Sequence, residues 1–342
     1  MADGTEHLPE PAADAETPVV SVILPTRNRA GSLQRALRSA LSQYGVSLEV
    51  LVVDDASTDG TADLLATAAA SDARIRVLRQ PECAGGAVAR NRGAKEAAAP
   101  FLAFLDDDDE WLPGKLERQV ALAMTSGAGV VSCGFAEVAE SGTAVRGGDV
   151  DLGAVPARAI LVRGNVLGLS ATLVRRDAFG QVGGFDARLP RLQDWDLWLR
   201  LAAAATFRHV PDALAVIHRS PHSISTEPHA LARAAEILAA KHAPVPQSET
   251  PAGGPRGLTP AEHAELLLAL ARLLVRDGQD RSGRRFAARS LAPPPWRPRR
   301  VAAGLLMSLA PGVYRRITRP FVRRSDSARE APVPAKSRNP RP

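Results

Sequence analysis

Cysteine is scarce in this sequence of 342 residues, where only Cys83 and Cys133 occur. Two cysteines so far apart match neither a zinc nor a redox spacing, and they cannot form a disulfide framework. Their scarcity fits a reducing compartment, so we expect a cytoplasmic protein. The apolar fraction of 45% is ordinary for a folded chain, and this length is enough for one large core with an appendage.

Each end of the chain lacks charge of one sign. Residues 1–18 contain no Lys or Arg and are acidic and rich in Pro and Ala, so we expect a disordered tail rather than a signal peptide. Between Arg281 and Ser325 there is no Asp or Glu, whereas arginine occurs twelve times. The net charge of +6 therefore belongs mainly to this C-terminal segment. Few aromatic residues accompany these arginines, which argues against nucleic-acid binding by base stacking.

Long apolar runs are also missing. Residues 301–313 form an apolar run of about thirteen residues, whereas a helix that spans a bilayer needs about twenty. Because arginines flank this run, it could lie on an anionic membrane surface. The alternative, which we favour, is a core-packed helix with a solvated basic rim.

The first third of the chain alternates between apolar strands and helices. Short, continuous apolar strands separated by helices predict a parallel sheet that is covered on both faces. We therefore expect an α/β fold with a mixed, mostly parallel sheet flanked by helices, followed by an α-helical C-terminal extension. The predicted strands are 19–24, 48–53, 75–78 and 101–105, and the predicted helices are 31–42, 61–70 and 86–98.

The pattern is less regular after residue 126. Strands are predicted at 130–136, 207–211 and 214–218, and helices at 228–242, 261–276 and 281–291. Residues 244–260 are rich in Pro, Gly, Ser and Thr, which is typical of a linker. The expected organisation is a tail (1–18), a folded α/β domain (19–243), the linker (244–260), a basic helical region (261–324) and a second tail (325–342).

Unusual polar residues follow three of the predicted strands. They are Pro25 to Asn28, the pair Asp54 and Asp55, and the acidic run Asp106 to Asp109. Ligands of such sheets bind at the carboxyl ends of the strands, so these clusters should meet at one edge. Side chains alternate along a strand, so Asp106 and Asp108 should point the same way and could hold Mg²⁺ or Mn²⁺ together with a substrate diphosphate. The alternative is a solvated acidic loop or a helix cap.

Five segments in this order resemble the family 2 glycosyltransferases, which are inverting enzymes with the GT-A fold. The resemblance covers residues 19 to about 220 and leaves out the linker and the C-terminal helices. The segments are VSVILPTRNRAGSLQRALRSALSQ from Val20, VVDDASTDGT from Val52, GGAVARNRG from Gly85, FLDDDDEWLPGKLERQ from Phe104 and GGFDARLPRLQDWDLWLRLA from Gly183.

For the donor, the resemblance implies a nucleotide pocket. Asp55 would accept a hydrogen bond from the imide N–H of the base, with Asp54 alongside, which selects uracil or thymine and hence a UDP- or dTDP-sugar. The first loop, Pro25, Thr26 and Arg27, would line this pocket, and Arg90 would reach the ribose or the phosphates. The alternatives are turn chemistry for the Asp54–Asp55 segment and a solvated helical arginine for Arg90.

For the metal, the resemblance matches the family's D-x-D motif to residues 106–108. Asp108 would bind Mg²⁺ or Mn²⁺ directly, and Asp106 would be a second ligand or contact the ribose or a water. Asp107, within the motif, is assigned to the nucleotide-sugar site. Asp109 would cap the next helix, and Trp111 would pack against that helix.

For the acceptor, the resemblance makes Asp194 the general base that deprotonates the attacking hydroxyl. Gln193 stands where the family usually has Glu, which could alter how the acceptor is oriented. Asp196 is the competing candidate, and a helix cap is the structural alternative for Asp194. Near this segment, Trp195 and Trp198 are interpreted as acceptor contacts or core residues. His218 and His222 are placed near the diphosphate, and a metal contact by His222 is left open.

The resulting hypothesis is a metal-dependent inverting sugar transferase that works on a glycan, a lipid-linked precursor or a small-molecule acceptor in the synthesis of cell-surface polysaccharide or glycolipid. Contact with the inner face of an anionic membrane through the basic C-terminal region would fit a membrane-proximal acceptor, and no nucleic-acid partner is expected. A nucleotidyltransferase is the first alternative, although it would carry a G-x-G-x-R loop where this chain has PTRNRAGS. A sugar-nucleotide-binding module without turnover is the second alternative.

Overall fold

The protein is known from a computed structural model that describes residues 17–139, 142–147, 150, 152–153, 155–219, 229–244, 257–291, 298–311 and 314. Within these residues one nine-stranded sheet has the order β3-β2-β1-β4-β8-β6-β9-β5, and β7 is paired with β6 off this path. The strands are β1 (Val20–Thr26), β2 (Leu48–Asp54), β3 (Ile75–Arg79), β4 (Phe101–Phe104), β5 (Glu110–Trp111), β6 (Val130–Ala139), β7 (Gly142–Arg146), β8 (Thr172–Arg175) and β9 (Phe207–His218).

The direction of the strands confirms the predicted fold class. Strands β1 to β4 run parallel to one another, as do β6 and β9. Strand β8 is antiparallel to both β4 and β6 and joins these two parallel groups, while the short strand β5 is antiparallel to β9. In the register, Thr26 of β1 is paired with Asp54 of β2, so the carboxyl ends of these strands are level. The sheet is therefore mixed and mostly parallel, with one edge where its carboxyl ends meet.

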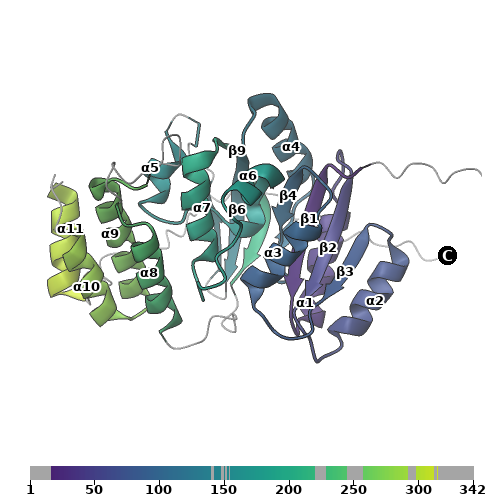
Figure 1. Ribbon diagram of the computed structural model, residues 1–342, viewed down its shortest axis with the longest axis horizontal. Helices are drawn as coiled ribbons and strands as arrows, with labels where there is room; N and C mark the ends of the chain where they lie inside the picture. The colour runs from purple at the N-terminus through teal and green to yellow at the C-terminus, as the bar shows by residue number, and fades with distance from the viewer. Residues whose placement is uncertain are drawn as a thin grey trace, which may run out of the picture.

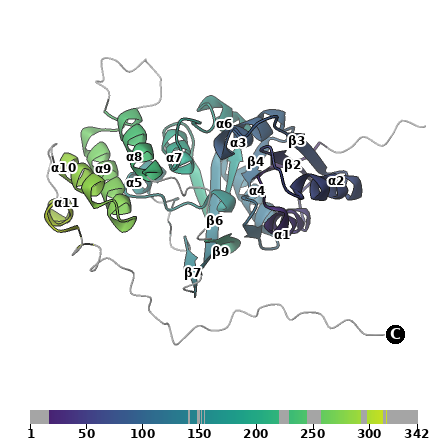
Figure 2. The ribbon, with the colours of Figure 1, turned by 90° about the horizontal axis from the view of Figure 1, so that it is seen from below.

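Helices cover both faces of the sheet because the strand side chains alternate between the faces. Along β1, Val22 and Leu24 belong to the apolar cluster that includes α1 (Ala30–Leu41) and α4 (Lys115–Ser126). Ile23 belongs to the opposite cluster, which includes residues of α3 (Gly86–Glu96), α6 (Arg176–Gln181) and α7 (Gln193–Ala204). Figure 2 shows the helices on the two sides of the strands. The remaining N-terminal helix, α2 (Thr61–Ser71), packs beside β3 (Figure 1).

The prediction of separate strands at 207–211 and 214–218 is wrong. Strand β9 is continuous from Phe207 to His218, and its pairing with β6 shifts register on either side of Gly134. A Cβ atom on Gly134 would lie 3.0 Å from the carbonyl oxygens of Pro211 and Asp212. The Pro-Asp pair therefore forms an irregularity that the glycine accommodates, and it does not end the strand.

The C-terminal helices lie at the end of the molecule opposite β3 (Figure 1). They are α8 (Ala230–Lys241), α9 (Pro260–Arg276), α10 (Asp280–Ser290) and α11 (Pro298–Leu309). Helix α9 begins at a capping box in which Thr259 and Glu262 exchange hydrogen bonds, with Pro260 in the first turn. The predicted α-helical extension is confirmed.

One apolar cluster joins these helices to the α/β part of the chain. It contains Trp198 of α7, Leu238 of α8, Leu270 of α9, Phe286 of α10 and Met307 of α11, all with no exposed surface. The described part of the predicted apolar run, in α11, therefore packs through Met307, whereas Leu305 and Leu309 of the same helix are exposed. On the other side of this cluster, α5 (Ala157–Leu161) contacts α7.

No helix in the part of the chain that the structure describes combines the length and the apolar character needed to cross a membrane. The predicted tails and the predicted linker at 244–260 lie almost entirely outside the described residues, and so does His222.

Candidate functional site

A cavity of about 520 Å³ opens at the carboxyl ends of β1, β2 and β4, and we call it the edge cavity. The strand ends meet there because the register holds Thr26 level with Asp54 and Ile23 level with Phe104. Of the residues predicted to form the nucleotide-sugar and metal sites, all but one line it: Pro25, Thr26, Arg27, Asp55, Arg90, Asp106, Asp107 and Asp108. The exception is Asp54.

Asp54 and Asp55 point to different surroundings although they are adjacent. The buried Asp54 carboxylate accepts a hydrogen bond from the Ser57 backbone N–H at 2.9 Å and lies 3.7 Å from Arg79 Nε. It therefore stabilises the turn after β2 instead of facing the edge cavity. The sequence alone does not show which of two adjacent aspartates at the end of a strand faces the cavity.

Asp55 holds the loop that leads into α3. Its carboxylate accepts from Gln80 Nε2 at 2.5 Å and from the backbone N–H groups of Ala84 and Gly85 at 2.8 and 2.9 Å. The thiol of Cys83 lies 3.4 Å from the second carboxylate oxygen. These four donors fill the acceptor capacity of a carboxylate, so any further donor must replace one of them. Gly85 has a φ of 89°, which favours glycine at this position.

The acidic run leaves the extended conformation earlier than predicted. Strand β4 ends at Phe104, and a hydrogen bond of 3.0 Å from Asp109 N to Asp106 O closes a turn. The prediction that the alternation of side chains along a strand makes Asp106 and Asp108 point the same way is therefore wrong, because these residues lie in a turn. The turn itself brings Asp106, Asp107 and Asp108 to the edge cavity.

The three carboxylates of this turn have different partners. Asp106 Oδ1 accepts from Arg90 Nη2 at 2.5 Å, and Asp108 Oδ2 lies 3.9 Å from Arg29 Nη1. Asp107 accepts from Thr26 Oγ1 at 2.7 Å. Burial, together with the charges of Asp108 and Asp106, raises the pKa of Asp107 to about 6 although the Thr26 hydrogen bond opposes the shift. Burial and the charge of Asp106 also raise the pKa of Asp108. The cluster thus holds negative charge at an energetic cost that a cation would relieve.

Asp109 does not cap a helix, contrary to the prediction. It is buried and accepts from Ser170 Oγ at 2.5 Å and from the backbone N–H of His218 at 3.0 Å. Helix α4 begins six residues later, at Lys115, with Gly114 as its N-cap. Burial and the charge of Asp106 hold the pKa of Asp109 well above its usual range. The residue fastens the acidic turn to β9 and to the short 3₁₀ helix at Leu169–Ala171.

A second cavity, of about 560 Å³, adjoins the edge cavity on the side of the C-terminal helices, and we call it the helix cavity. Three residues line both cavities, namely Asp106, Arg191 and Leu192. The helix cavity is also lined by Asp194 at the start of α7, by the segment 163–169 and by the end of α9. Leu192, just before α7, has a φ of 62°, so the chain turns sharply where the two cavities meet.

Asp194 is half-buried and held in one orientation. Asn165 Nδ2 donates to Asp194 Oδ2 at 2.7 Å, and the backbone N–H of Trp195 donates to Oδ1 at 2.8 Å. Burial raises the pKa of Asp194, although these two hydrogen bonds oppose the shift. Asn165 was missed from the sequence because it belongs to no recognisable motif. Gln193, beside Asp194, donates to Leu189 O at 2.8 Å and lines the edge cavity.

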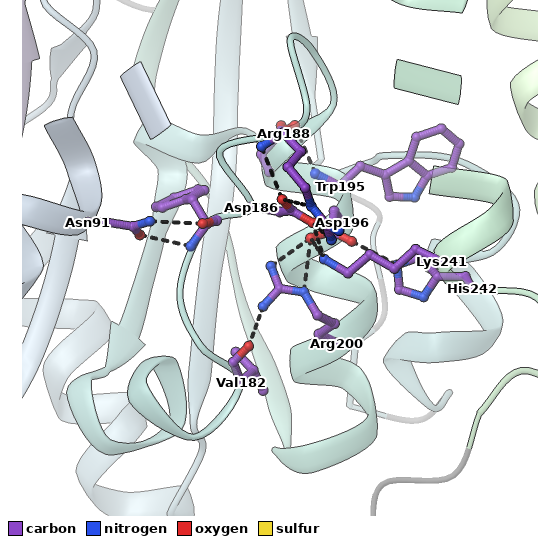
Figure 3. A network of polar contacts seen from close by, with 11 residues as sticks. Asn91, Val182, Asp186, Arg188, Trp195, Asp196, Arg200, Lys241 and His242 are labelled. Carbon is purple, nitrogen blue, oxygen red and sulfur yellow. Dashed lines mark hydrogen bonds and ion pairs between the residues drawn. The ribbon is translucent and has the colours of Figure 1, made fainter. Parts of the chain in front are cut away.

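Asp196 is enclosed by basic side chains (Figure 3). It lines neither cavity. It accepts from Arg200 Nε at 2.9 Å, from Arg200 Nη2 at 2.6 Å and from Lys241 Nζ at 3.0 Å, and it lies 2.9 Å from His242 Nε2. Burial opposes ionisation, but the hydrogen bond to His242 and the charge of Arg200 outweigh it and lower the pKa of Asp196 to about 2. This carboxylate therefore joins α7 to α8.

The remaining predicted residues have structural partners. Trp111, Trp195 and Trp198 are buried, and the indole N–H groups of the first two donate to the carbonyl oxygens of Ser170 and Leu161. The ring of His218 lies 2.9 Å from Glu110 Oε1. The three tryptophans belong to the core of the described chain, and Trp195 also lines the helix cavity beside Asp194.

The profile of Glycosyl transferase family 2 matches residues 21–179. A relative from Bacillus subtilis (strain 168), named as a candidate teichuronic acid biosynthesis glycosyltransferase, TuaG, is 32% identical over 189 residues, which cover 54% of this chain and 72% of the relative. The next two relatives are matched over only 38% and 41% of their own lengths.

Solved structures share the fold. Staphylococcus aureus TarS 1–349 in complex with UDP-GlcNAc superimposes with a TM-score of 0.53 at 18% identity, covering 80% of this chain and 72% of TarS 1–349. The mannosyltransferase PcManGT from Pyrobaculum calidifontis, in complex with GDP-Man and Mn²⁺, gives a TM-score of 0.56 at 21% identity, covering 89% and 84% of the two chains. At these identities the likeness extends to the fold alone.

Proposed function

This chain belongs to glycosyl transferase family 2, and from that premise we propose that it transfers a sugar from a UDP- or dTDP-linked donor to an acceptor hydroxyl with inversion at the anomeric carbon. The edge cavity would take the donor and the helix cavity the acceptor. The observation that carries the proposal is their junction, because Asp106 lines both cavities while Asp194 lines the second.

The edge cavity suits a nucleoside diphosphate. Its volume of about 520 Å³ lies in the range of small-ligand sites. Gly85 and Gly86 begin α3, where backbone N–H groups favour phosphate, and Arg29, Arg90 and Arg191 line the same cavity. The Nε atom of Arg90 is buried and has no hydrogen-bond partner among the described residues, so it offers a donor to a ligand. A uracil or thymine imide N–H would replace the Cys83 thiol, which is the weakest of the four donors to Asp55.

The acidic turn fits Mg²⁺ or Mn²⁺ as a partial ligand set. Within the described residues no group of three or more His, Cys, Asp or Glu side chains is placed to hold a metal ion. Mg²⁺, however, is typically bound by one or two carboxylates together with substrate phosphates and waters, which Asp106 and Asp108 can provide. When bound, such an ion would neutralise the charge that develops on the departing diphosphate. The Mn²⁺ in the PcManGT complex supports the assignment of a divalent cation.

Asp194 would act as the base. Its carboxylate would take the proton of the acceptor hydroxyl while that oxygen bonds to the anomeric carbon, and the bond from that carbon to the diphosphate oxygen breaks with its electron pair. Asn165 and the Trp195 N–H fix the direction of the carboxylate, and burial makes it more basic than an exposed aspartate. Arg90, released from Asp106, could pair with the diphosphate.

The product would be a cell-surface glycan or one of its precursors, assembled on the cytoplasmic side. The name of TuaG and the UDP-GlcNAc bound in TarS support this assignment and a UDP-sugar donor. Peripheral contact with the inner face of the membrane through the basic C-terminal region is part of the same proposal.

A donor screen tests the proposal. The full chain is incubated with UDP-, dTDP- and GDP-sugars, Mn²⁺ and a mixture of acceptors, and the release of free nucleoside diphosphate is measured. We expect UDP or dTDP release from at least one donor, loss of release with EDTA and its recovery with Mn²⁺. Asp108→Asn should lower metal-supported release by at least about 100-fold, whereas Asp212→Asn, on an exposed ion pair with Arg118, should not.

Other outcomes would favour the alternatives. Release of pyrophosphate from a nucleoside triphosphate and a sugar phosphate, with no release from any nucleotide sugar, would indicate a nucleotidyltransferase. Binding of a nucleotide sugar without release of diphosphate, under all acceptor conditions, would indicate a module without turnover. Either result contradicts the transferase proposal.

A further inference from the structure

Arginine is the most frequent charged residue around the helix cavity. Five arginines line it from four separate parts of the chain: Arg163, Arg191, Arg219, Arg272 and Arg276. The acidic side chains that line it are Asp106, Asp109 and Asp194, and the first of these is paired with Arg90. Positive charge therefore exceeds negative charge around the cavity that contains Asp194.

Two of these arginines have acidic partners. Arg191 Nη1 lies 3.7 Å from Asp277 Oδ1, and Arg219 Nε lies 2.8 Å from Glu137 Oε1. Arg163, Arg272 and Arg276 form no ion pair with a carboxylate in the described part of the chain. Arg272 and Arg276 are also four residues apart on α9, a spacing that puts like charges on one helix face and destabilises an unliganded helix.

Guanidinium groups gathered in this way are suited to phosphate. Arginine offers a planar set of N–H donors that matches phosphate oxygens, and it keeps its charge at any physiological pH. A carboxylate carries one negative charge, whereas a phosphate monoester carries up to two and therefore balances more than one guanidinium group. The number of arginines without acidic partners therefore favours a phosphate-bearing ligand over a carboxylate.

On the basis of the proposed function, we infer that the helix cavity binds an acceptor that carries a phosphate or diphosphate group, which Arg163, Arg272 and Arg276 hold while its hydroxyl faces Asp194. Two of the three arginines lie on α9, outside the residues 21–179 that match the family profile. The C-terminal helices would thus supply part of the substrate site. The same chemistry occurs in lipid-linked sugar diphosphates and in soluble sugar phosphates.

A direct binding test uses inorganic pyrophosphate and the full chain in buffer without divalent metal, with UDP in excess to occupy the edge cavity. We expect Arg272→Gln/Arg276→Gln to bind pyrophosphate at least about tenfold more weakly than the unaltered chain, since charge-assisted hydrogen bonds are lost. The matched control is Arg281→Gln/Arg284→Gln, which removes the same charge from exposed positions of α10 and should bind within about twofold of the unaltered chain. Thermal melting shows whether each variant is folded. If the double variant is not folded, the single variant Arg276→Gln, at an exposed position, replaces it.

The second arm separates the two sources of phosphate. Glucose 1-phosphate is compared with methyl glucoside, and phosphatidylcholine vesicles with and without farnesyl diphosphate are compared in a sedimentation assay. The inference is supported if glucose 1-phosphate or farnesyl diphosphate binds and if this binding requires Arg272 and Arg276. The probe that binds then shows whether the phosphate belongs to a soluble sugar phosphate or to a lipid. Equal binding of pyrophosphate by both double variants and the unaltered chain would overturn the inference.

The result is independent of donor turnover. If the α9 variant loses pyrophosphate binding and no nucleotide sugar releases its diphosphate, the anion site stands and the transferase proposal fails. If donors are turned over and the α9 variant binds pyrophosphate normally, the transferase proposal stands and the phosphate-bearing acceptor is excluded.

Discussion

Replacement of Asp194 by asparagine is expected to lower the rate of sugar transfer by about 10²–10⁴-fold, which is the usual contribution of a positioned general base. The amide keeps nearly the same shape beside Asn165 but cannot take a proton from the acceptor hydroxyl. Binding of UDP should stay within about twofold, because Asp194 lines the helix cavity and not the edge cavity. Single-turnover transfer rates and equilibrium binding of UDP, measured on the same preparation, separate the two effects.

The control for this variant is Asp212→Asn, which changes an exposed aspartate of β9 and should leave both quantities unchanged. If Asp194→Asn transfers sugar at the full rate, another residue must be the general base. Asp196 was the competing candidate from the sequence, but Arg200, Lys241 and His242 enclose its carboxylate, so it is not available to an acceptor hydroxyl. Asp106 and Asp109, which line the same cavity, would then be tested next.

Replacement of Asp196 by alanine is expected to lower the free energy of unfolding by about 3–5 kcal/mol, the range for breaking a buried ion pair from one side. The carboxylate has no exposed surface, and its removal leaves Arg200, Lys241 and His242 without their shared partner between α7 and α8. Urea denaturation at neutral pH measures the loss. Asp177→Ala removes an exposed ion pair with Arg175 and should cost less than about 1 kcal/mol.

The stability contributed by Asp196 should disappear in acid. Its pKa is lowered to about 2 in the folded protein, against about 4 for an unfolded aspartate. The contribution is therefore complete above pH 4 and is lost as the pH falls from 4 toward 2. The difference in unfolding free energy between the unaltered chain and Asp196→Ala should be smaller at pH 3 than at pH 6. An equal difference at both pH values would contradict the assignment of Asp196 as an ionised structural partner.

The fold could be predicted because its strands carry a strong and simple pattern. Continuous apolar runs such as the one at 20–24 are buried on both faces, and helices with regular apolar spacing separate them. Strand β9 was divided in error because a Pro-Asp pair usually ends a strand. The space beside Gly134 that admits this irregularity depends on the pairing with β6, which no local pattern reveals.

The edge cavity was largely predictable and the helix cavity was not. Parallel strands end at one edge of the sheet, so the residues that follow β1, β2 and β4 meet there. The directions in which the side chains of Asp54 and Asp109 point depend on turns, which the sequence does not reveal. The helix cavity combines Asn165 with α9, about one hundred residues further along the chain. The resemblance pointed to Asp194, but nothing in the sequence says that Arg272 and Arg276 of α9 line the same cavity.

The most direct measurement of the central claim is the anomalous scattering of Mn²⁺ in crystals of the full chain soaked with MnCl₂ and UDP. The account predicts an anomalous peak beside Asp106 and Asp108 in the edge cavity, with the diphosphate of UDP on the same ion and Asp194 facing it from the helix cavity. UDP bound elsewhere, or a manganese peak remote from these two carboxylates, would contradict it.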